Sequence, residues 1–289
     1  MRANHFVVVM TVTLGLLLVH GASAAPAALE EVRVVFVRDG VFASPTDEAW
    51  EQIPETTYSL QAQLVTPPVG GGSVSKVSVR ATHDAEELAI RLEWSDASAD
   101  RGVGVDTFRD AVAIGFPVGR PTVNPSPFMG DEKHPVVIWQ WAADFDADAE
   151  GKSRFGERYP HSEGVWIFPQ DLMVRRKVRG WRGADPVIEY VARGFGTLTP
   201  RMETTVEGSS SYKRGRWSVV LRRKLETDNE QDPVFIPGQA SFLILAVWNG
   251  DKQEVNGRKA VTYQWIPAKF DDIMSATARA DYGDSDAAE

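Results

Sequence analysis

Two residues that can donate an electron pair to a metal stand in distinctive surroundings. Met129 lies in the segment Pro-Ser-Pro-Phe-Met-Gly-Asp at positions 125–131, and Lys259 lies in the segment at positions 248–261. A methionine thioether is a soft neutral ligand for iron. Flanking prolines restrict φ and Gly130 permits a sharp turn, so this loop can present the thioether at a fixed position. The alternative for Met129 is a buried side chain that fills a gap in the core.

A lysine ligates a metal only as the neutral amine, and its ordinary pKa is about 10.4. Burial disfavours the ammonium, and a metal competes with the proton. Two lysines of the second segment are candidates. We expect Lys252 to be solvated because it falls in the polar turn that starts at Asn249. Lys259 starts an expected strand, where a side chain can point inward; its alternative is an ordinary charge at a strand edge.

The elements that must position these residues are mostly strands. Apolar residues alternate with others at period two in many segments, and Gly, Pro and Asp separate the segments. The expected strands cover residues 32–37, 74–81, 88–94, 111–116, 136–141, 190–195, 217–222, 242–248 and 260–265. This spacing favours an all-β fold, an antiparallel β-sandwich with long loops and few short helices. The helical turns are expected at 45–52, around Trp50, and at 268–280.

The chain divides into three parts. Residues 1–24 have the positive start, apolar run and small-residue cleavage site of a secretory signal peptide. Residues 25–280 form one domain, with loop-like stretches at 119–135 and 144–166, and residues 281–289 form a flexible acidic tail. Because no later stretch is apolar enough to span a bilayer, we expect no membrane span in the mature protein.

Composition excludes several functions. The chain has no cysteine, so it cannot attach a haem covalently, hold an iron–sulfur cluster by thiolates or use a thiol nucleophile. The formal net charge of −9 argues against nucleic acid and anionic membranes as partners. Hydrolase, zinc-protease and phosphate-loop motifs are lacking.

Further segments carry a resemblance to a known family. They are residues 108–113, 139–144, 194–199 and 215–223. Together with the two ligand segments, in this order and spacing, they resemble the haem b (gamma) subunit of the type II dimethyl sulfoxide reductase family. That family includes ethylbenzene dehydrogenase, selenate reductase, chlorate reductase and dimethyl sulfide dehydrogenase. The resemblance implies one non-covalent haem b with Met129 and Lys259 as axial ligands, hence an electron-transfer subunit that is not itself an enzyme.

The resemblance also implies partners and further site residues. The partners are an iron–sulfur beta subunit and a molybdenum bis-pterin alpha subunit in a periplasmic heterotrimer, and a soluble periplasmic cytochrome. Trp139 and Trp248, with Trp141, could pack near the porphyrin, although tryptophans on strands are more often plain core. Arg258, like Arg222 and Arg223, could pair with haem propionates, and a solvated position is the alternative for each.

Histidine is the usual haem ligand, and three histidines follow residue 24. We expect His83 to be exposed in a hairpin turn. His134 shares the loop of Met129 and could replace it as a ligand. His161 lies on the long polar loop and could replace Lys259.

Two other functions remain compatible with the sequence. The first is a carbohydrate-binding module without haem, since sandwich domains of carbohydrate-binding family 9 have a similar fold and stack sugars on exposed tryptophans. The second is a structural subunit that has lost its haem. The substrate of the complex and the direction of electron flow are not encoded in this chain.

Overall fold

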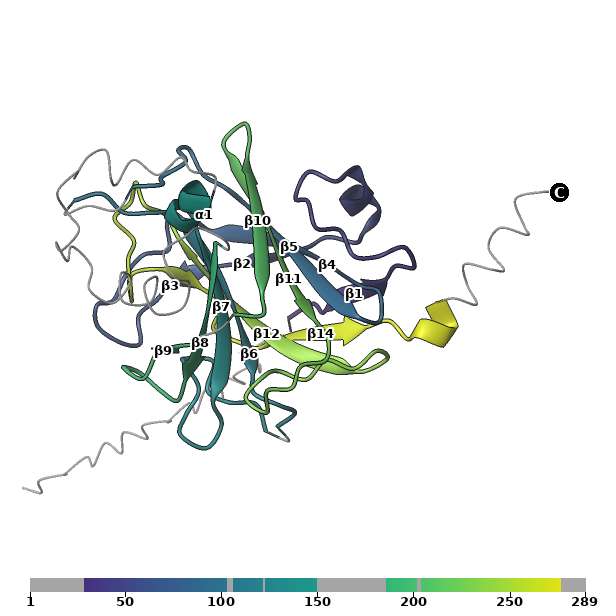
Figure 1. Ribbon diagram of the computed structural model, residues 1–289. Coiled ribbons are helices and arrows are strands. Elements are labelled where there is room, and N and C mark those ends of the chain that lie inside the picture. Colours follow the sequence, from purple (N-terminus) through teal and green to yellow (C-terminus); the bar gives the residue numbers. More distant parts are fainter. Residues whose placement is uncertain (1–28, 103–105, 122, 150–185, 202–203, 277–289) are drawn as a thin grey trace, which may run out of the picture.

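The computed structural model describes residues 29–102, 106–121, 123–149, 186–201 and 204–276. These residues form fourteen strands, two short helices and a helical turn at residues 273–276 (Figure 1). The strands are β1 (Val32–Phe36), β2 (Thr56–Ser59), β3 (Gln61–Ala62), β4 (Lys76–His83), β5 (Glu87–Ser95), β6 (Ala111–Pro117), β7 (Val136–Ala142), β8 (Val187–Ala192), β9 (Thr199–Pro200), β10 (Glu207–Tyr212), β11 (Arg216–Lys224), β12 (Ala240–Trp248), β13 (Ala260–Val261) and β14 (Ile266–Phe270). The helices are the 3-10 helix η1 (Glu48–Gln52) and α1 (Ala143–Ala149).

The strands form one continuous path that folds back on itself. Its order is β10-β11-β5-β4-β1-β14-β12-β6-β7-β8-β9. Strand β12 pairs with β14 through its first half, Ala240–Leu243, and with β6 through its second half, Ile244–Trp248. It therefore passes from one layer to the other, and the two layers enclose a common core. The predicted all-β sandwich is confirmed.

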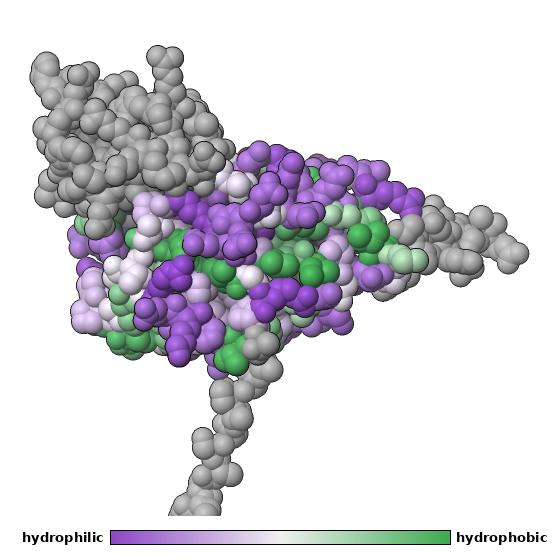
Figure 2. Space-filling view, turned by 60° about the horizontal axis from the view of Figure 1, so that its bottom comes forward, coloured by the Kyte–Doolittle hydropathy of each residue, from purple (hydrophilic) through white to green (hydrophobic). Residues whose placement is uncertain are grey.

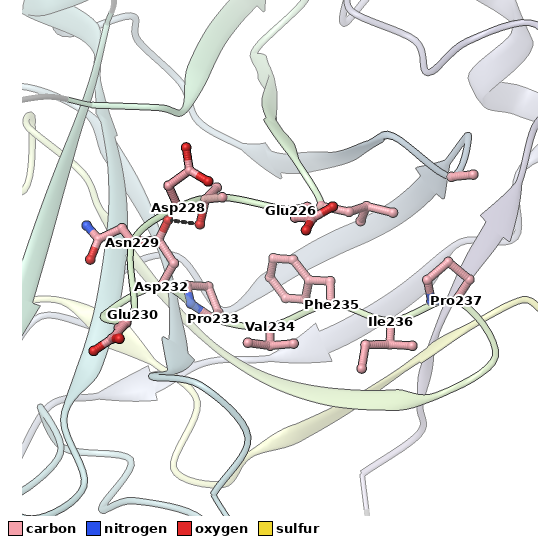
Figure 3. A pocket seen from close by; sticks show the side chains of 13 residues that line it. Glu226, Asp228, Asn229, Glu230, Asp232, Pro233, Val234, Phe235, Ile236 and Pro237 are labelled. Atoms are coloured by element: carbon pink, nitrogen blue, oxygen red, sulfur yellow. Dashed lines mark hydrogen bonds between the residues drawn. The ribbon is translucent and has the colours of Figure 1, made fainter.

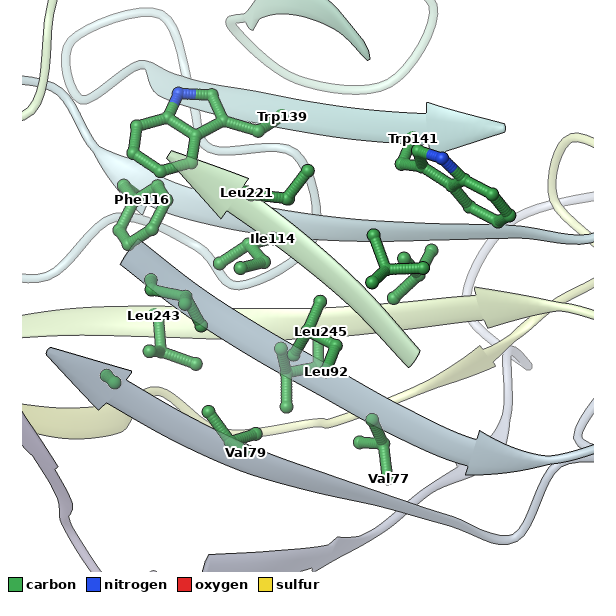
Figure 4. Packing of buried hydrophobic residues seen from close by; sticks show 14 of the residues in the cluster. Val77, Val79, Leu92, Ile114, Phe116, Trp139, Trp141, Leu221, Leu243 and Leu245 are labelled. Carbon is green, nitrogen blue, oxygen red and sulfur yellow. The ribbon is translucent and has the colours of Figure 1, made fainter. Parts of the chain in front are cut away.

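Alternation places one face of each strand in this core. Leu92 on β5 and Leu221 on β11 meet Ile114 on β6 and Leu245 on β12 between the layers (Figure 4). All four side chains are buried, and full burial of a side chain of this size stabilises the fold by about 1.5–3 kcal/mol. Because alternate residues of β6 and β12 point away from this core, the same strands also build an outer face.

The sheet differs from the prediction in direction at one strand. β1 pairs in parallel with both β4 and β14, so the sandwich is mixed rather than wholly antiparallel. Neither partner follows β1 through a tight hairpin, and no short turn therefore imposes the antiparallel direction.

Three boundaries also differ from the prediction. The expected helix at 268–280 begins instead as strand β14, and only residues 273–276 of its described part are helical. The strand expected at 190–195 is β8, which begins and ends earlier, and that expected at 260–265 is the short β13. The 3-10 helix around buried Trp50 is confirmed, and its N-cap Asp47 accepts a hydrogen bond from the Ala49 amide at 2.9 Å.

The expected signal peptide at 1–24, the acidic tail at 281–289 and His161 lie outside the described residues, as does most of the stretch 144–166. Within the described residues, no helix has the length and apolar character needed to cross a membrane. On the face shown in Figure 2, apolar groups are small and lie between polar side chains.

Candidate functional site

The backbone of Lys259 is held by a glycine-rich loop. Its amide donates a hydrogen bond to the Gly70 carbonyl at 3.0 Å, and its carbonyl accepts one from the Gln63 amide at 3.0 Å. Gly71 has φ +87° and lies so close that an added Cβ would clash with the Lys259 backbone nitrogen. Only glycine permits both this conformation and this approach. The loop therefore fixes where the lysine side chain starts.

Buried Gln63 locks this loop to the segment before Lys259. Its side-chain amide donates to the carbonyls of Thr66 at 2.7 Å and Gly257 at 3.0 Å. Its side-chain oxygen accepts from the Thr66 amide at 2.8 Å. Both ends of the side chain are thus satisfied, which makes this connection costly to break.

The Lys259 side chain is an amine without an acidic partner. It is half-buried, and its Nζ lies 4.9 Å from the centroid of the Trp248 ring. Among the described residues, no carboxylate forms an ion pair with it. Burial lowers the pKa of Lys259 from 10.5 to about 8. At pH 7 the neutral fraction rises accordingly from about 1 in 3,000 to about 1 in 10, so this amine is far more available as a ligand than a surface lysine.

Trp248 connects Lys259 to an apolar cluster on the outer face of the sheet. This outer apolar cluster consists of Ala111, Ala113, Ala142, Phe145, Ile188, Tyr190 and Trp248. Val247 pairs with Ala260, so Trp248 and Lys259 are the next cross-strand neighbours. The Trp248 indole donates to the Asn256 carbonyl at 3.0 Å, which fixes the ring. The three alanines are buried, with at most 3% of their surfaces exposed, so this cluster meets the Lys259 amine through the Trp248 ring.

The Met129 loop is fixed by its backbone. Met129 and Gly130 have φ of +72° and +67°, and the Met129 carbonyl accepts from the Gly194 amide at 2.8 Å. The Gly130 amide donates to the Ser126 carbonyl at 3.0 Å. A non-glycine residue with positive φ is uncommon and persists only where its surroundings hold it. Met129 is half-buried, not a core gap-filler.

This loop lies against the segment that continues from Lys259. The rings of Phe128 and Tyr263 are 5.3 Å apart, and the Trp265 indole donates to the Pro125 carbonyl at 2.7 Å. The structure thus places the Met129 loop beside residues 263–265, which follow Lys259 in the chain.

The other lysine and Arg258 occupy different environments. Lys252 is exposed, as expected, and its Nζ lies 2.5 Å from the Asp251 carboxylate, whose hydrogen bond raises the pKa of the amine. It therefore stays protonated. Arg258 precedes Lys259, is exposed and forms no ion pair with a described residue.

Trp139 and Trp141 point away from Lys259. Both project from β7 into the core between the layers (Figure 4), and Trp139 packs 4.5 Å from the Phe116 ring. The structure does not bring Trp139 together with the two ligand candidates, and plain core packing describes its position.

Arg222 and Arg223, the other two arginines that could pair with propionates, already have partners within the protein. The buried Arg223 guanidinium donates to the Pro233 carbonyl at 3.0 Å and lies 3.4 Å from Asp232. Arg222 pairs with Glu87 at 3.3 Å.

The expected exposure of His83 is wrong. β4 extends to this residue, and its ring is buried between Phe36 and Phe270, with Nε2 3.0 Å from the Asp271 carbonyl oxygen. Burial lowers the pKa of His83. His134 does lie on the Met129 loop, but its Nδ1 is 3.2 Å from Asp131.

A separate hollow of about 530 Å³ lies along residues 225–237 (Figure 3). The carboxylates that line it belong to Glu226, Asp228, Glu230 and Asp232. No lining residue is a methionine, lysine or histidine, and the carboxylates would repel the propionates of a haem. This hollow does not suit that cofactor.

Sequence reasoning missed the parts that hold Lys259. Residues 70–72 are three consecutive glycines, and such a run can signal a close backbone approach. In the sequence, the only trace of the outer apolar cluster is the pair of alternate alanines Ala111 and Ala113 at the start of one expected strand.

Comparison with known proteins gives one family. The family described as "Ethylbenzene dehydrogenase" matches residues 47–167 and 172–260. The chlorate reductase subunit gamma of Ideonella dechloratans is 29% identical over 253 residues, covering 86% of this chain and 87% of the relative. A protein of Haloferax mediterranei, provisionally named as respiratory nitrate reductase heme subunit ORF7, is 29% identical over 228 residues, covering 78% of this chain and 67% of the relative.

Among solved structures, a carbohydrate binding module of family 9 from Caldicellulosiruptor kristjanssonii, in complex with cellotriose, superposes with a TM-score of 0.44 at 8% identity. The superposition covers 84% of this chain and 94% of that one.

Proposed function

This chain belongs to the ethylbenzene dehydrogenase family, and from this premise we propose that it is the haem-binding electron-transfer subunit of an oxidoreductase complex. The haem would be a non-covalent haem b with Lys259 and Met129 as axial ligands. The observation that carries this proposal is the Lys259 amine, which is half-buried, has a lowered pKa and lacks a carboxylate partner among the described residues.

The residues present fit the cofactor. An amine and a thioether are both electron-pair donors to haem iron, and two backbone-fixed loops present them. The Trp248 ring, 4.9 Å from the Lys259 amine, would contact the porphyrin. Arg258, which is exposed and next to Lys259 in the chain, would pair with a propionate. Because the chain has no cysteine, the cofactor would stay non-covalent.

The bound haem would supply one-electron exchange. The protein's own part is to hold the cofactor and limit access to it. If Met129 and Lys259 both bound the iron, neither oxygen nor a substrate would have a free position on it, so we assign no substrate chemistry to this chain. Its acidic net charge of −9 suits docking of a basic electron-transfer partner.

The relatives' names support assembly with other subunits, since one is named a gamma subunit and the other a heme subunit. We propose an iron–sulfur beta subunit and a molybdenum bis-pterin alpha subunit as partners, and a soluble periplasmic cytochrome as the exchange partner. The loop beside Lys259 exposes Leu64, Val65 and Val69, with 68%, 45% and 48% of their surfaces accessible. Apolar side chains grouped beside the haem ligand suit a protein contact. The location would be the periplasm, after cleavage of residues 1–24.

The test is the optical spectrum of the full-length protein, produced with haem supplied, in its oxidised and dithionite-reduced forms. We expect the sharp reduced bands of low-spin haem b, and their loss or shift in Met129→Ala and Lys259→Leu. Lys252→Leu is the matched control, because its side chain is exposed and paired, and it should keep the spectrum. A folded protein that takes up no haem would overturn the proposal.

The carbohydrate-binding alternative has no comparable support. It needs an exposed aromatic platform, and no tryptophan of the described residues is exposed. Haem-free protein that binds oligosaccharides would nevertheless restore it.

A further inference from the structure

Three carboxylates converge where the connection between β5 and β6 begins and ends. Asp96 and Asp100 follow β5, and Asp110 precedes β6. One carboxylate oxygen from each lies within 4.8 Å of the others. Asp110 is fully buried and Asp96 is 5% exposed. Carboxylates are rarely buried together without a compensating charge.

No cationic side chain compensates this cluster directly. Among the described residues, no lysine, arginine or histidine forms an ion pair with any of the three carboxylates. Burial, together with the charge of Asp100, raises the pKa of Asp96. Burial and the charge of Asp96 raise the pKa of Asp110 to about 7. The arrangement is electrostatically unfavourable as it stands.

The Asp110 carboxylate is held firmly in place. It accepts hydrogen bonds from the Asp100 amide at 2.7 Å, the Gly250 amide at 2.8 Å and the Trp217 indole at 2.9 Å. Such a carboxylate is set for its charged form, yet a second acid faces it.

Asp96 has a buried oxygen that is poorly satisfied. Its Oδ1 accepts from the Ser98 amide at 3.3 Å, and its buried Oδ2 has no hydrogen bond of normal length in the described part of the chain, although the Trp94 indole acts on this carboxylate and lowers its pKa. A buried acceptor left unpaired carries a desolvation penalty. A cation between the three carboxylates would satisfy this oxygen and offset the repulsion.

We propose that Asp96, Asp100 and Asp110 bind a calcium ion. Hard carboxylate oxygens are the ligands that Ca²⁺ prefers, at about 2.3–2.6 Å, so two oxygens across one ion are separated by at most about 5 Å. The 4.8 Å limit on the three oxygens agrees with this. Ca²⁺ also accepts irregular coordination completed by carbonyls and water, whereas Mg²⁺ demands a near-octahedral shell.

The ion would connect parts of the chain that are distant in sequence. The Asp110 carboxylate accepts a hydrogen bond from the Gly250 amide, and Gly250 lies two residues after Trp248. The ion would therefore hold the end of β12 to the start of β6, next to the ring that contacts Lys259. The site itself stands independently of the haem proposal.

The test is calcium titration of the full-length protein after treatment with EGTA, by calorimetry and by thermal melting. We expect one ion per chain, and a rise in Tm of roughly 5–10 °C when free calcium exceeds Kd about a hundredfold. Asp96→Asn should weaken binding at least tenfold while the melt without calcium stays cooperative. Asp251→Asn is the control, since it removes a nearby exposed charge but no proposed ligand, and it should keep affinity within about twofold.

Three outcomes would overturn the proposal. They are the absence of heat and Tm change at millimolar calcium, unchanged binding in Asp96→Asn, and tighter binding of magnesium than of calcium. If calcium produced neither heat nor a change in Tm, protonation of the carboxylates would be what relieves their mutual repulsion. Binding that survives haem removal would separate this site from the haem proposal.

Discussion

Lys259→Leu should stabilise the haem-free protein while it removes one of the two proposed axial ligands. The drop of the lysine pKa from 10.5 to about 8 corresponds to roughly 3 kcal/mol at about 1.4 kcal/mol for each tenfold change in the proton equilibrium. This is the cost of keeping the ammonium in its folded surroundings. The contact with the Trp248 ring offsets about 0.5–2 kcal/mol, and part of the side chain remains accessible. We therefore expect Lys259→Leu to raise the free energy of unfolding of the haem-free protein by about 1–3 kcal/mol at pH 7.

The stability that Lys259→Leu gains over the unsubstituted protein should decrease as the pH rises. The folded pKa of Lys259 is depressed, so the penalty is fully present below about pH 8. Between about pH 8 and 10.5 the unfolded state binds more protons than the folded state, and the stability of the unsubstituted protein rises with pH. Above pH 10.5 the amine is neutral in both states, and the variant should lose its advantage.

Urea unfolding of haem-free protein at pH 7 and pH 10.5 measures both effects. Lys252→Leu is the matched control, and its change should stay within about 0.5 kcal/mol at pH 7 because that side chain is exposed. A haem-free Lys259→Leu protein that is less stable at pH 7, or a gain that persists unchanged at pH 10.5, would refute the reasoning.

Three further predictions concern the same site. Gly71→Ala should destabilise the protein by more than 2 kcal/mol and weaken haem binding, because it combines φ +87° with a backbone clash against Lys259; Gly119→Ala, at φ +61° with open space around its Cβ, should cost only about 1 kcal/mol in urea unfolding. Trp139→Phe should lower Tm through lost core packing but leave the reduced haem spectrum unchanged, and an altered spectrum would contradict its placement in the core. Haem affinity, titrated optically, should fall about tenfold per pH unit below pH 8 and level off above it, because ligation displaces one proton from Lys259.

Period-two patterns predicted the strands well because burial on one face is a local property of the sequence. On β5, every second residue points into the hydrophobic core, namely Leu88, Ile90, Leu92 and Trp94. Residues 268–270, predicted as part of a helix, were misassigned because pairing with β1 and β12 makes them a strand, and no local pattern reveals that pairing. His83 was misassigned for a similar reason, since the rings that bury it come from both ends of the chain.

The candidate site was predictable as residue types but not as geometry. The sequence distinguished Lys259 from Lys252 by the polar turn around the latter, and the structure agrees in their exposure. Nothing in the sequence tied Gln63 or Gly71 to Lys259, because those contacts join distant segments. Trp139 and Trp248 looked equivalent, and only the register of the sheet places them on opposite faces.

The parallel strand β1 has a consequence for the timing of cofactor uptake. It lies between β4 and β14, so its second neighbour is the last strand of the described chain. During synthesis, β1 waits with one edge unpaired until Phe270 has been made, and the two layers cannot close before then. Lys259 is itself made only shortly before that strand. A nascent chain therefore has neither a closed sandwich nor both proposed ligands, so under the proposed function the haem would be captured only after this strand has been made.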